Sequence, residues 1–270
     1  MIKYEINSIA EKPKGTEVIL NPIAATLGTK SQYRVALNNM LRGIARSMMA
    51  SVLPALKHHR RFTADSEDWF ISLEIEAEDL ARQASSIAQA VLALEAARHS
   101  KRFIASAKSA LGIDLNAVIR DEDLIEYLLD SASANANLIK SLKNDTIKDI
   151  RRIVLAAKRE GFSSRTVARE ITERFNEELA DTFDKAVKRA RLIAEDQTNK
   201  LNGDLSRIRQ EQAGIDSYIW QDADDRRVRP RHAEIDGNEY RWDEPTDAEG
   251  GLHPGGPVRC RCTARGVVRF

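Results

Sequence analysis

Three shortages in this sequence exclude whole classes of protein. The 270 residues include 2 cysteines, Cys260 and Cys262, and these lie too close together for a disulfide framework. The formal net charge of +1 argues against a globally basic nucleic-acid-binding protein. No apolar run approaches the roughly 20 residues that cross a bilayer, and the sequence from Met1 to Glu5 has no signal-peptide core. We therefore expect a soluble protein that is made in a reducing cytoplasm.

Between residues 31 and 212, apolar side chains recur at the three- and four-residue spacing that is typical of helices. Tyr33, Leu37, Met40 and Ile44 are the first residues of this pattern. The pattern predicts helices over 31–53, from Ser66 through 111, over 120–129, over 138–160, over 164–175 and over 178–212. Breaks between helices are expected at Pro54, Gly112, 131–137, Gly161 and Gly214.

The composition changes after Gly214, where glycine, proline and arginine become dense. The segment from Tyr218 to Trp220 predicts a strand that leads into this C-terminal region. Two hairpins are expected, one over 234–242 with its turn at Asp236-Gly237, and one over 258–268. The end of the chain is therefore expected to be a small α+β module.

The expected fold class is mainly α, with a long-helix body and a small C-terminal α+β module that contains short hairpins. The first residues are irregular, except for a short strand expected at 16–20, and we interpret them as an arm that docks elsewhere. The expected regions are an N-terminal arm over 1–30, a helical region over 31–135, a second helical region over 136–214 and the α+β module over 215–270.

The two cysteines and two of the histidines form a candidate metal site. Cys260 and Cys262 supply two thiolates, and His232 and His253 supply two imidazoles, a donor set that suits tetrahedral zinc. Structural zinc sites usually separate their cysteines by about two to four residues, so a single intervening residue is atypical. In the alternative interpretation, His232 binds a nearby carboxylate and the cysteines are small buried apolar groups. Zinc is the one candidate cofactor, and both interpretations stay open.

Acidic and basic residues crowd the sequence just before His232. His232, Asp225 and Asp236 have the chemistry of a metal-dependent nuclease or hydrolase, in which histidine activates water and carboxylates hold Mg²⁺. The alternative is a loop that is ordered by salt bridges, and this alternative is favoured because no paired-carboxylate or nucleophile motif stands out.

Two helical stretches carry clusters of basic residues that are candidates for DNA contact without sequence preference. Acidic residues are interleaved with them, which favours a solvated helix face for any one cluster. Few aromatic residues lie near these charges, so base stacking is poorly supported. The candidate contact residues are Lys148, Arg151, Arg152, Lys188 and Arg189.

An ordered set of short motifs resembles the phage head morphogenesis family, the Mu F-like minor head proteins. The resemblance covers roughly residues 140–265. The motifs are Ala190–Gln197 and Asn199–Asn202 in a long helix, Gly214-Ile215, Tyr218, Trp220, Asp225, Arg227-Val228-Arg229, His232, Asp236-Gly237, His253-Pro254-Gly255 and Cys260-Arg261-Cys262. Within this set we interpret seven residues as a structural motif of the module: Trp220, Asp225, Arg227, Arg229, Asp236, Gly237 and Arg261.

The resemblance implies a minor capsid protein of a tailed phage or prophage, which acts in procapsid assembly and in DNA packaging or delivery. It implies a place in the virion interior near the portal, after assembly in the bacterial cytoplasm. The implied partners are the portal protein and the inner capsid surface, with non-specific DNA contact and no membrane. It also implies that the protein is not primarily an enzyme. Some relatives carry a toxin domain after this module, and we expect none here because the sequence ends at Phe270.

Overall fold

The computed structural model describes residues 3–52, 68–160 and 165–270. Contacts between residues divide the chain into two compact units, each assembled from separate stretches of sequence. The sheet unit comprises Met1–Lys30, Ala90–Ser131 and Glu195–Phe270. The bundle unit comprises Ser31–Gln89 and Ala132–Ala194. The three longest helices each contribute residues to both units.

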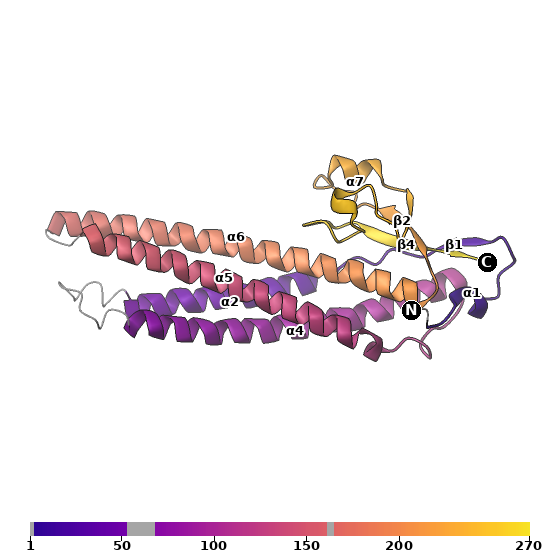
Figure 1. Cartoon of the computed structure of the whole chain (residues 1–270), viewed down its shortest axis with the longest axis horizontal. Helices are drawn as coiled ribbons and strands as arrows, with labels where there is room; N and C mark the ends of the chain where they lie inside the picture. The colour runs from indigo at the N-terminus through magenta and orange to yellow at the C-terminus, as the bar shows by residue number, and fades with distance from the viewer. Residues whose placement is uncertain (1–2, 53–67, 161–164) are drawn as a thin grey trace. The chain divides into compact units, whose positions relative to one another are not determined.

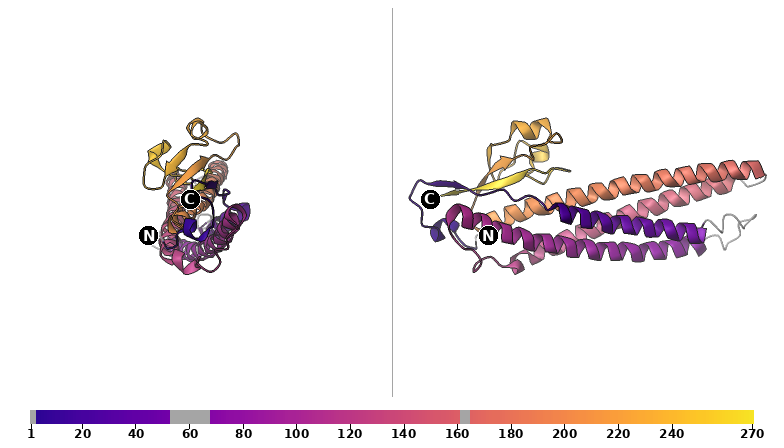
Figure 2. Two further views of the ribbon diagram at one scale, coloured as in Figure 1. Left: turned by 90° about the vertical axis from the view of Figure 1, so that its right-hand side faces the viewer. Right: turned by 180° about the vertical axis from the view of Figure 1, so that it is seen from behind.

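The bundle unit consists of long antiparallel helical segments. Its helices are α2 (Leu27–Ser47, followed by the π-helical turn η1, Met48–Val52) and parts of α4 (Asp68–Leu111), α5 (Ile125–Glu160) and α6 (Arg165–Gln212). Figures 1 and 2 show α2 beside the first half of α4, and α5 beside α6. The helices α2 and α4 approach closely at Gly43, where an added Cβ would lie 2.6 Å from the Leu80 side chain. A buried hydrogen bond of 2.6 Å from Tyr33 to Asn135 joins α2 to α5.

Two helices are longer than the sequence pattern predicts. The break expected at 131–137 is wrong, because α5 continues through this stretch and buries Asn135 as the partner of Tyr33. The separate helices expected over 164–175 and 178–212 are one helix, α6. The expected break at Gly112 is confirmed, with φ of +78° directly after α4. The breaks expected at Pro54 and Gly161 lie outside the described residues.

The sheet unit contains a four-stranded antiparallel sheet with strand order β1-β4-β2-β3. The strands are β1 (Glu17–Ile19), β2 (Ser217–Gln221), β3 (Glu239–Arg241) and β4 (Thr263–Arg269). The two local hairpins expected from sequence are wrong. Segment 234–242 supplies only β3, which pairs with β2, and segment 258–268 lies mostly before or within the single strand β4. The expected strand at 16–20 is confirmed as β1, and its partner is β4 near the C-terminus.

The sheet unit also contains short helical turns. These are α1 (Ile6–Ile9), η3 (Asp121–Leu124), α7 (Pro230–Glu234) and η4 (Glu249–Gly251), of which α7 connects β2 to β3 and η4 connects β3 to β4. Figures 1 and 2 show the sheet and α7 beside the C-terminal part of α6. Gln210 of α6 joins the two, because its side chain accepts a hydrogen bond of 3.1 Å from the Trp242 indole and donates one of 3.3 Å to the Ala264 carbonyl. Gly266 leaves the space for this glutamine, since an added Cβ would lie 2.9 Å from it.

Two apolar clusters form the core of the sheet unit. One gathers α1, the end of α4 and the segment after α6, with Ile6, Phe103 and Leu115 fully buried. The other lies inside the C-terminal region and contains Tyr218, Trp220, Ile235, Trp242, Ala248, Cys260, Cys262 and Ala264. The fold class expected from the sequence, mainly α with a small C-terminal α+β module, is confirmed. Among the described helices, none is both long enough and apolar enough to cross a membrane.

Candidate functional site

The second apolar cluster brings His232, Cys260 and Cys262 together. His232 lies in α7, and the cysteines lie in the segment that leads into β4. The His232 Nδ1 atom is 3.7 Å from the Cys260 Sγ atom and 3.4 Å from the Cys262 Sγ atom. All three side chains are buried, and both cysteines are free thiols. Three of the four metal ligands that the sequence suggested therefore converge, and their donor atoms all lie within 4.8 Å of one another.

The opposite side of the His232 ring has a carboxylate partner. Its Nε2 atom lies 2.6 Å from the Glu249 Oε2 atom, in the turn η4. The Trp220 ring meets the imidazole edge-on, with ring centroids 5.2 Å apart. Glu249 was not among the sequence candidates, because it lies far from His232 in the sequence and belongs to a short irregular turn. The contact fixes the orientation of the ring and directs Nδ1 toward the cysteines.

The two thiols interact with each other as well as with the histidine. The hydrogen bond between them lowers the pKa of Cys260. Burial opposes this shift, and a hydrogen bond with the Cys262 backbone adds to it. The same contact, together with burial, raises the pKa of Cys262. The two buried sulfur atoms therefore lie close enough to each other to interact directly. Sulfur and imidazole nitrogen atoms grouped in this way are the donor types that bind metals.

The fourth suggested ligand, His253, lies elsewhere in the module. Its Nδ1 atom is 2.7 Å from the Tyr218 hydroxyl, and its ring packs on Trp242 with centroids 5.0 Å apart. It is not part of the group formed by His232 and the two cysteines in the described part of the chain. Burial lowers the pKa of His253, so its ring is neutral near pH 7. In this structure the residue is a packing element of the aromatic cluster.

His253 begins a loop that lies directly on helix α6. The Pro254 carbonyl oxygen is so close to the helix that a Cβ at Gly203 would lie 2.3 Å from it. Gly255 has φ of +87°, and a Cβ there would lie 2.8 Å from the Asn199 carbonyl oxygen. Two glycines are thus required where the loop and the helix meet. Gly203 was not singled out in the sequence, although an isolated glycine inside a helical pattern is a signal of close packing.

The charged residues that precede His232 form ordered loop contacts. Asp225 forms a bidentate ion pair with Arg261 and accepts a hydrogen bond of 2.8 Å from the Arg227 backbone N–H. The Arg261 hydrogen bond holds the pKa of Asp225 well below its usual range. Arg229 donates to the Val258 carbonyl and lies 3.5 Å from Glu249. These contacts connect the α7 loop to the segment that carries the cysteines.

Asp236 and Gly237 form the turn that follows α7. The Asp236 carboxylate accepts a hydrogen bond of 2.7 Å from the Asp222 backbone. Gly237 has φ of +80° and donates from its backbone to the Trp220 carbonyl at 2.9 Å. His232, Asp225 and Asp236, the residues of the hydrolase interpretation, therefore have three different sets of partners. The salt-bridged loop is the arrangement that the described residues adopt.

Four of the five basic residues suggested for DNA contact are close to acidic partners. Lys188 lies 2.5 Å from Asp184, Arg189 pairs with Asp145, Arg152 lies 3.7 Å from Asp149 and Arg151 lies 3.9 Å from Glu74. Lys148 is exposed. Exposed ion pairs of this kind reduce the positive charge that a phosphate backbone would meet. DNA contact by these residues stays a prediction.

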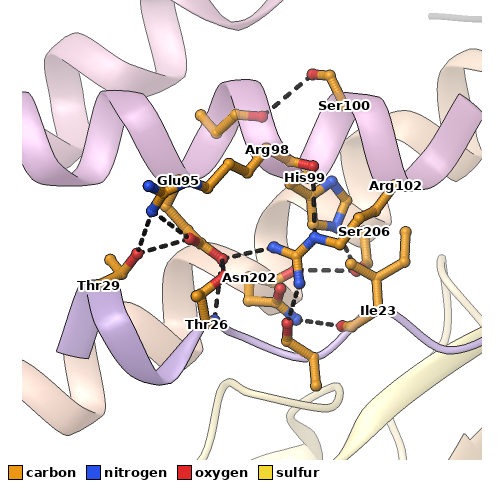
Figure 3. Close-up of polar contacts among 12 residues, drawn as sticks. Ile23, Thr26, Thr29, Glu95, Arg98, His99, Ser100, Arg102, Asn202 and Ser206 are labelled. Carbon is orange, nitrogen blue, oxygen red and sulfur yellow. Dashed lines mark hydrogen bonds and ion pairs between the residues drawn. The ribbon is translucent and has the colours of Figure 1, made fainter. Parts of the chain in front are cut away.

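A buried polar network, which the sequence analysis missed, fastens residues 23–29 to helices α4 and α6 (Figure 3). The Glu95 carboxylate is fully buried and accepts hydrogen bonds from Thr26 at 2.9 Å, Thr29 at 2.6 Å and Arg102 at 2.6 Å. Next to it, Asn202 of α6 donates to the Ile23 carbonyl at 2.6 Å. The segment that follows β1 is thus an integral part of the sheet unit.

His99 belongs to the same region and is fully buried on α4. Its Nε2 atom is 3.0 Å from the Ser206 hydroxyl of α6. Burial lowers the pKa of His99 to about 3, so the ring is neutral at physiological pH. We interpret it as a structural residue that joins α4 to α6.

Comparison with known proteins connects this module to one family. Residues 148–265 match the family model described as "Phage Mu protein F like protein", which confirms the resemblance inferred from the sequence. An uncharacterized protein of Haemophilus influenzae is 33% identical over 189 residues. The aligned part covers 69% of this chain and 40% of that protein, so the chain spans less than half of the relative's length. No solved structure matches the chain.

Proposed function

We propose that this chain is a minor capsid protein acting in head morphogenesis, because its residues 148–265 match the phage Mu protein F-like family. The observation that carries this proposal is the family match, which extends through β2 and β3 and ends at the start of β4. We further propose that the protein works inside the head of a tailed phage or prophage, near the portal. There it would assist procapsid assembly and DNA packaging or delivery.

The internal contacts of the module support an assembly role over a catalytic one. The side chains that could act in catalysis instead hold loops together. His232 contacts Glu249, and Asp225 contacts Arg261. Asp236 accepts a hydrogen bond from the backbone of its own loop. A protein that presents a folded module to a partner needs such ordered loops, whereas hydrolysis would need the three residues to converge on one substrate.

The bundle unit offers a candidate surface for the portal or the inner capsid. Ile71 and Ile75 lie one turn apart on α4, and their exposed fractions are 50% and 61%. Neighbouring exposed isoleucines on one helix face favour contact with another protein. We propose that this face contributes to incorporation of the protein into the head.

A deletion and complementation experiment tests the proposed function. The gene is deleted from the phage or prophage that encodes it, and particles are examined by electron microscopy and plaque titre. We expect a loss of filled heads that the wild-type gene restores. Unchanged heads and an unchanged titre after the deletion would contradict the proposal.

A pair of variants tests the candidate surface in the same assay. Replacement of Ile71 and Ile75 by glutamate should leave the protein folded but prevent rescue, because it places charge on the proposed contact. Ser86→Glu is the matched control, since Ser86 is an exposed residue of the same helix. Equal rescue by both variants would exclude this surface as the contact and leave the head assignment standing.

A further inference from the structure

We propose that His232, Cys260 and Cys262 bind one zinc ion that stabilises the C-terminal module. This inference is independent of the proposed head function, because it concerns how the module folds. It also differs from the four-ligand site suggested by the sequence. His253 is not a ligand, because it contacts Tyr218, and Glu249 instead contacts the ligand histidine and orients it.

The spacing of the three donor atoms fits a tetrahedral ion. With Zn–S bonds of about 2.3 Å and a Zn–N bond of about 2.0 Å, a tetrahedral centre separates nitrogen from sulfur by about 3.5 Å. The distances from His232 Nδ1 to the two sulfur atoms are 3.7 Å and 3.4 Å. Ordinary core packing does not require two thiols and an imidazole nitrogen to face one point at these separations. The nitrogen-to-sulfur distances are thus close to those that a tetrahedral ion requires.

The carboxylate behind the imidazole also supports a metal site. The Glu249 Oε2 atom lies 2.6 Å from His232 Nε2, so Nε2 carries a hydrogen and donates a hydrogen bond to the carboxylate. The lone pair of Nδ1 then faces the two sulfur atoms. A carboxylate that orients a ligand histidine in this way is a common second layer of zinc sites. Arg229 lies 3.5 Å from the same carboxylate and helps to hold it in place.

The chemistry of the donors selects the metal. Two thiolates and one imidazole are soft and intermediate ligands, which favour zinc over magnesium, calcium or manganese. In the described part of the chain no fourth histidine, cysteine or carboxylate joins the group. The remaining coordination position is therefore expected to hold a water molecule.

The position of the site explains why the module would need the ion. Cys260 and Cys262 precede β4, whereas His232 belongs to α7 after β2, so the ion would cross-link two segments that meet only in the folded module. The apolar cluster around them is small. Small modules with limited cores commonly gain stability from a structural metal, because only the folded chain assembles the ligands.

The first test measures metal in the purified full-length chain. The protein is prepared under reducing conditions without a histidine tag, and zinc, copper and iron are measured by inductively coupled plasma mass spectrometry. We expect about one zinc per chain in the wild type and in His253→Gln, and at least a tenfold lower content in the double variant Cys260→Ser, Cys262→Ser. Absence of metal from the wild type, after dialysis against micromolar zinc and removal of the excess, would overturn the proposal. Loss of zinc in His253→Gln alone, with the cysteine variant unaffected, would do the same.

A second test does not depend on whether the cysteine variants fold. The wild-type protein is loaded with Co²⁺, and the absorption spectrum is recorded between the near-ultraviolet and the red. Thiolate-to-cobalt charge transfer together with tetrahedral d–d bands supports the site, and a spectrum of hydrated cobalt contradicts it. In Glu249→Gln the bands should remain while the affinity falls by about 10- to 100-fold, because this residue orients a ligand and does not bind the ion. Unchanged affinity in this variant would exclude Glu249 from the site.

Discussion

The contact between helix α6 and the loop at Pro254 makes a sharp prediction for Gly203→Ala. In an ordinary helix interior this change stabilises a protein by about 0.5–1 kcal/mol. Here the new Cβ would lie 2.3 Å from the Pro254 carbonyl oxygen and 3.3 Å from the Gly255 Cα atom. Non-bonded heavy atoms pack best at about 3.5 Å, so the Pro254 carbonyl oxygen would have to move about 1 Å away from the new Cβ.

The loop has little freedom to make that movement. His253, just before Pro254, is hydrogen-bonded to Tyr218 and packed on Trp242, and Gly255 itself lies against the Asn199 carbonyl. Overpacking of this kind costs typically about 1–3 kcal/mol. After subtraction of the helix gain, we expect Gly203→Ala to lower the free energy of unfolding of the sheet unit by roughly 1–2 kcal/mol.

Urea unfolding followed by tryptophan fluorescence measures this change. A Trp69→Phe background restricts the signal to Trp220 and Trp242, which are buried in the C-terminal module. Gly28→Ala is the matched control, because its Cβ would meet only the Thr26 methyl group at 3.8 Å, an ordinary contact. The control should be as stable as the parent or slightly more stable. If Gly203→Ala behaves like the control, the close approach of loop and helix is wrong.

Three further changes test other contacts. Gln210→Ala should lower the free energy of unfolding by about 1–3 kcal/mol in the same urea assay, because the buried Trp242 indole loses its acceptor. Tyr33→Phe should cost about 1 kcal/mol through loss of a buried hydrogen bond in the bundle unit, and urea unfolding followed by circular dichroism would detect it. Asp225→Asn should remove part of the acid sensitivity of the module. The Arg261 hydrogen bond lowers the pKa of Asp225 in the folded protein. The stability that this carboxylate contributes is therefore present above the ordinary pKa of 3.8 and is lost as the pH falls below that value. Identical unfolding curves for parent and Asp225→Asn between pH 4 and pH 2 would contradict this assignment.

The helices were predictable because their apolar spacing is regular, but their joins were not. The run 131–137 is small and polar, and such residues usually mark a loop. In the structure, Asn135 is buried because Tyr33, about a hundred residues earlier, supplies a partner for its side chain. A contact between positions so far apart in the chain leaves no trace in local periodicity. Tertiary packing therefore keeps α5 continuous where the local composition suggested that a helix would end.

Strand pairing was mispredicted for a related reason. Neighbouring segments were expected to pair as hairpins, because sequential strands are usually neighbours in a sheet. The sheet instead places β2 at its centre, between β3 and β4, and adds β1 from the N-terminus at one edge. Only the identity of each strand segment, such as Tyr218 to Trp220, could be recognised from its residues. Their order in space depends on contacts across the whole unit.

The candidate site was partly accessible from the sequence. Cysteine and histidine are rare in this chain, so His232, Cys260 and Cys262 were natural candidates, and the structure brings them together. His253 has the same chemistry but occupies the aromatic cluster. Glu249 is one of many acidic residues, so nothing in its type distinguished it before its position beside His232 was known.

Quantitative mass spectrometry of purified particles tests the proposed function most directly. Virions and DNA-free procapsids of the encoding phage are digested, and this chain is counted against the portal protein and the major capsid protein. A minor head protein that enters during assembly should be present in a few copies per particle in both preparations. Absence from both particles, with the protein still abundant in infected cells, would contradict the assignment to the phage head.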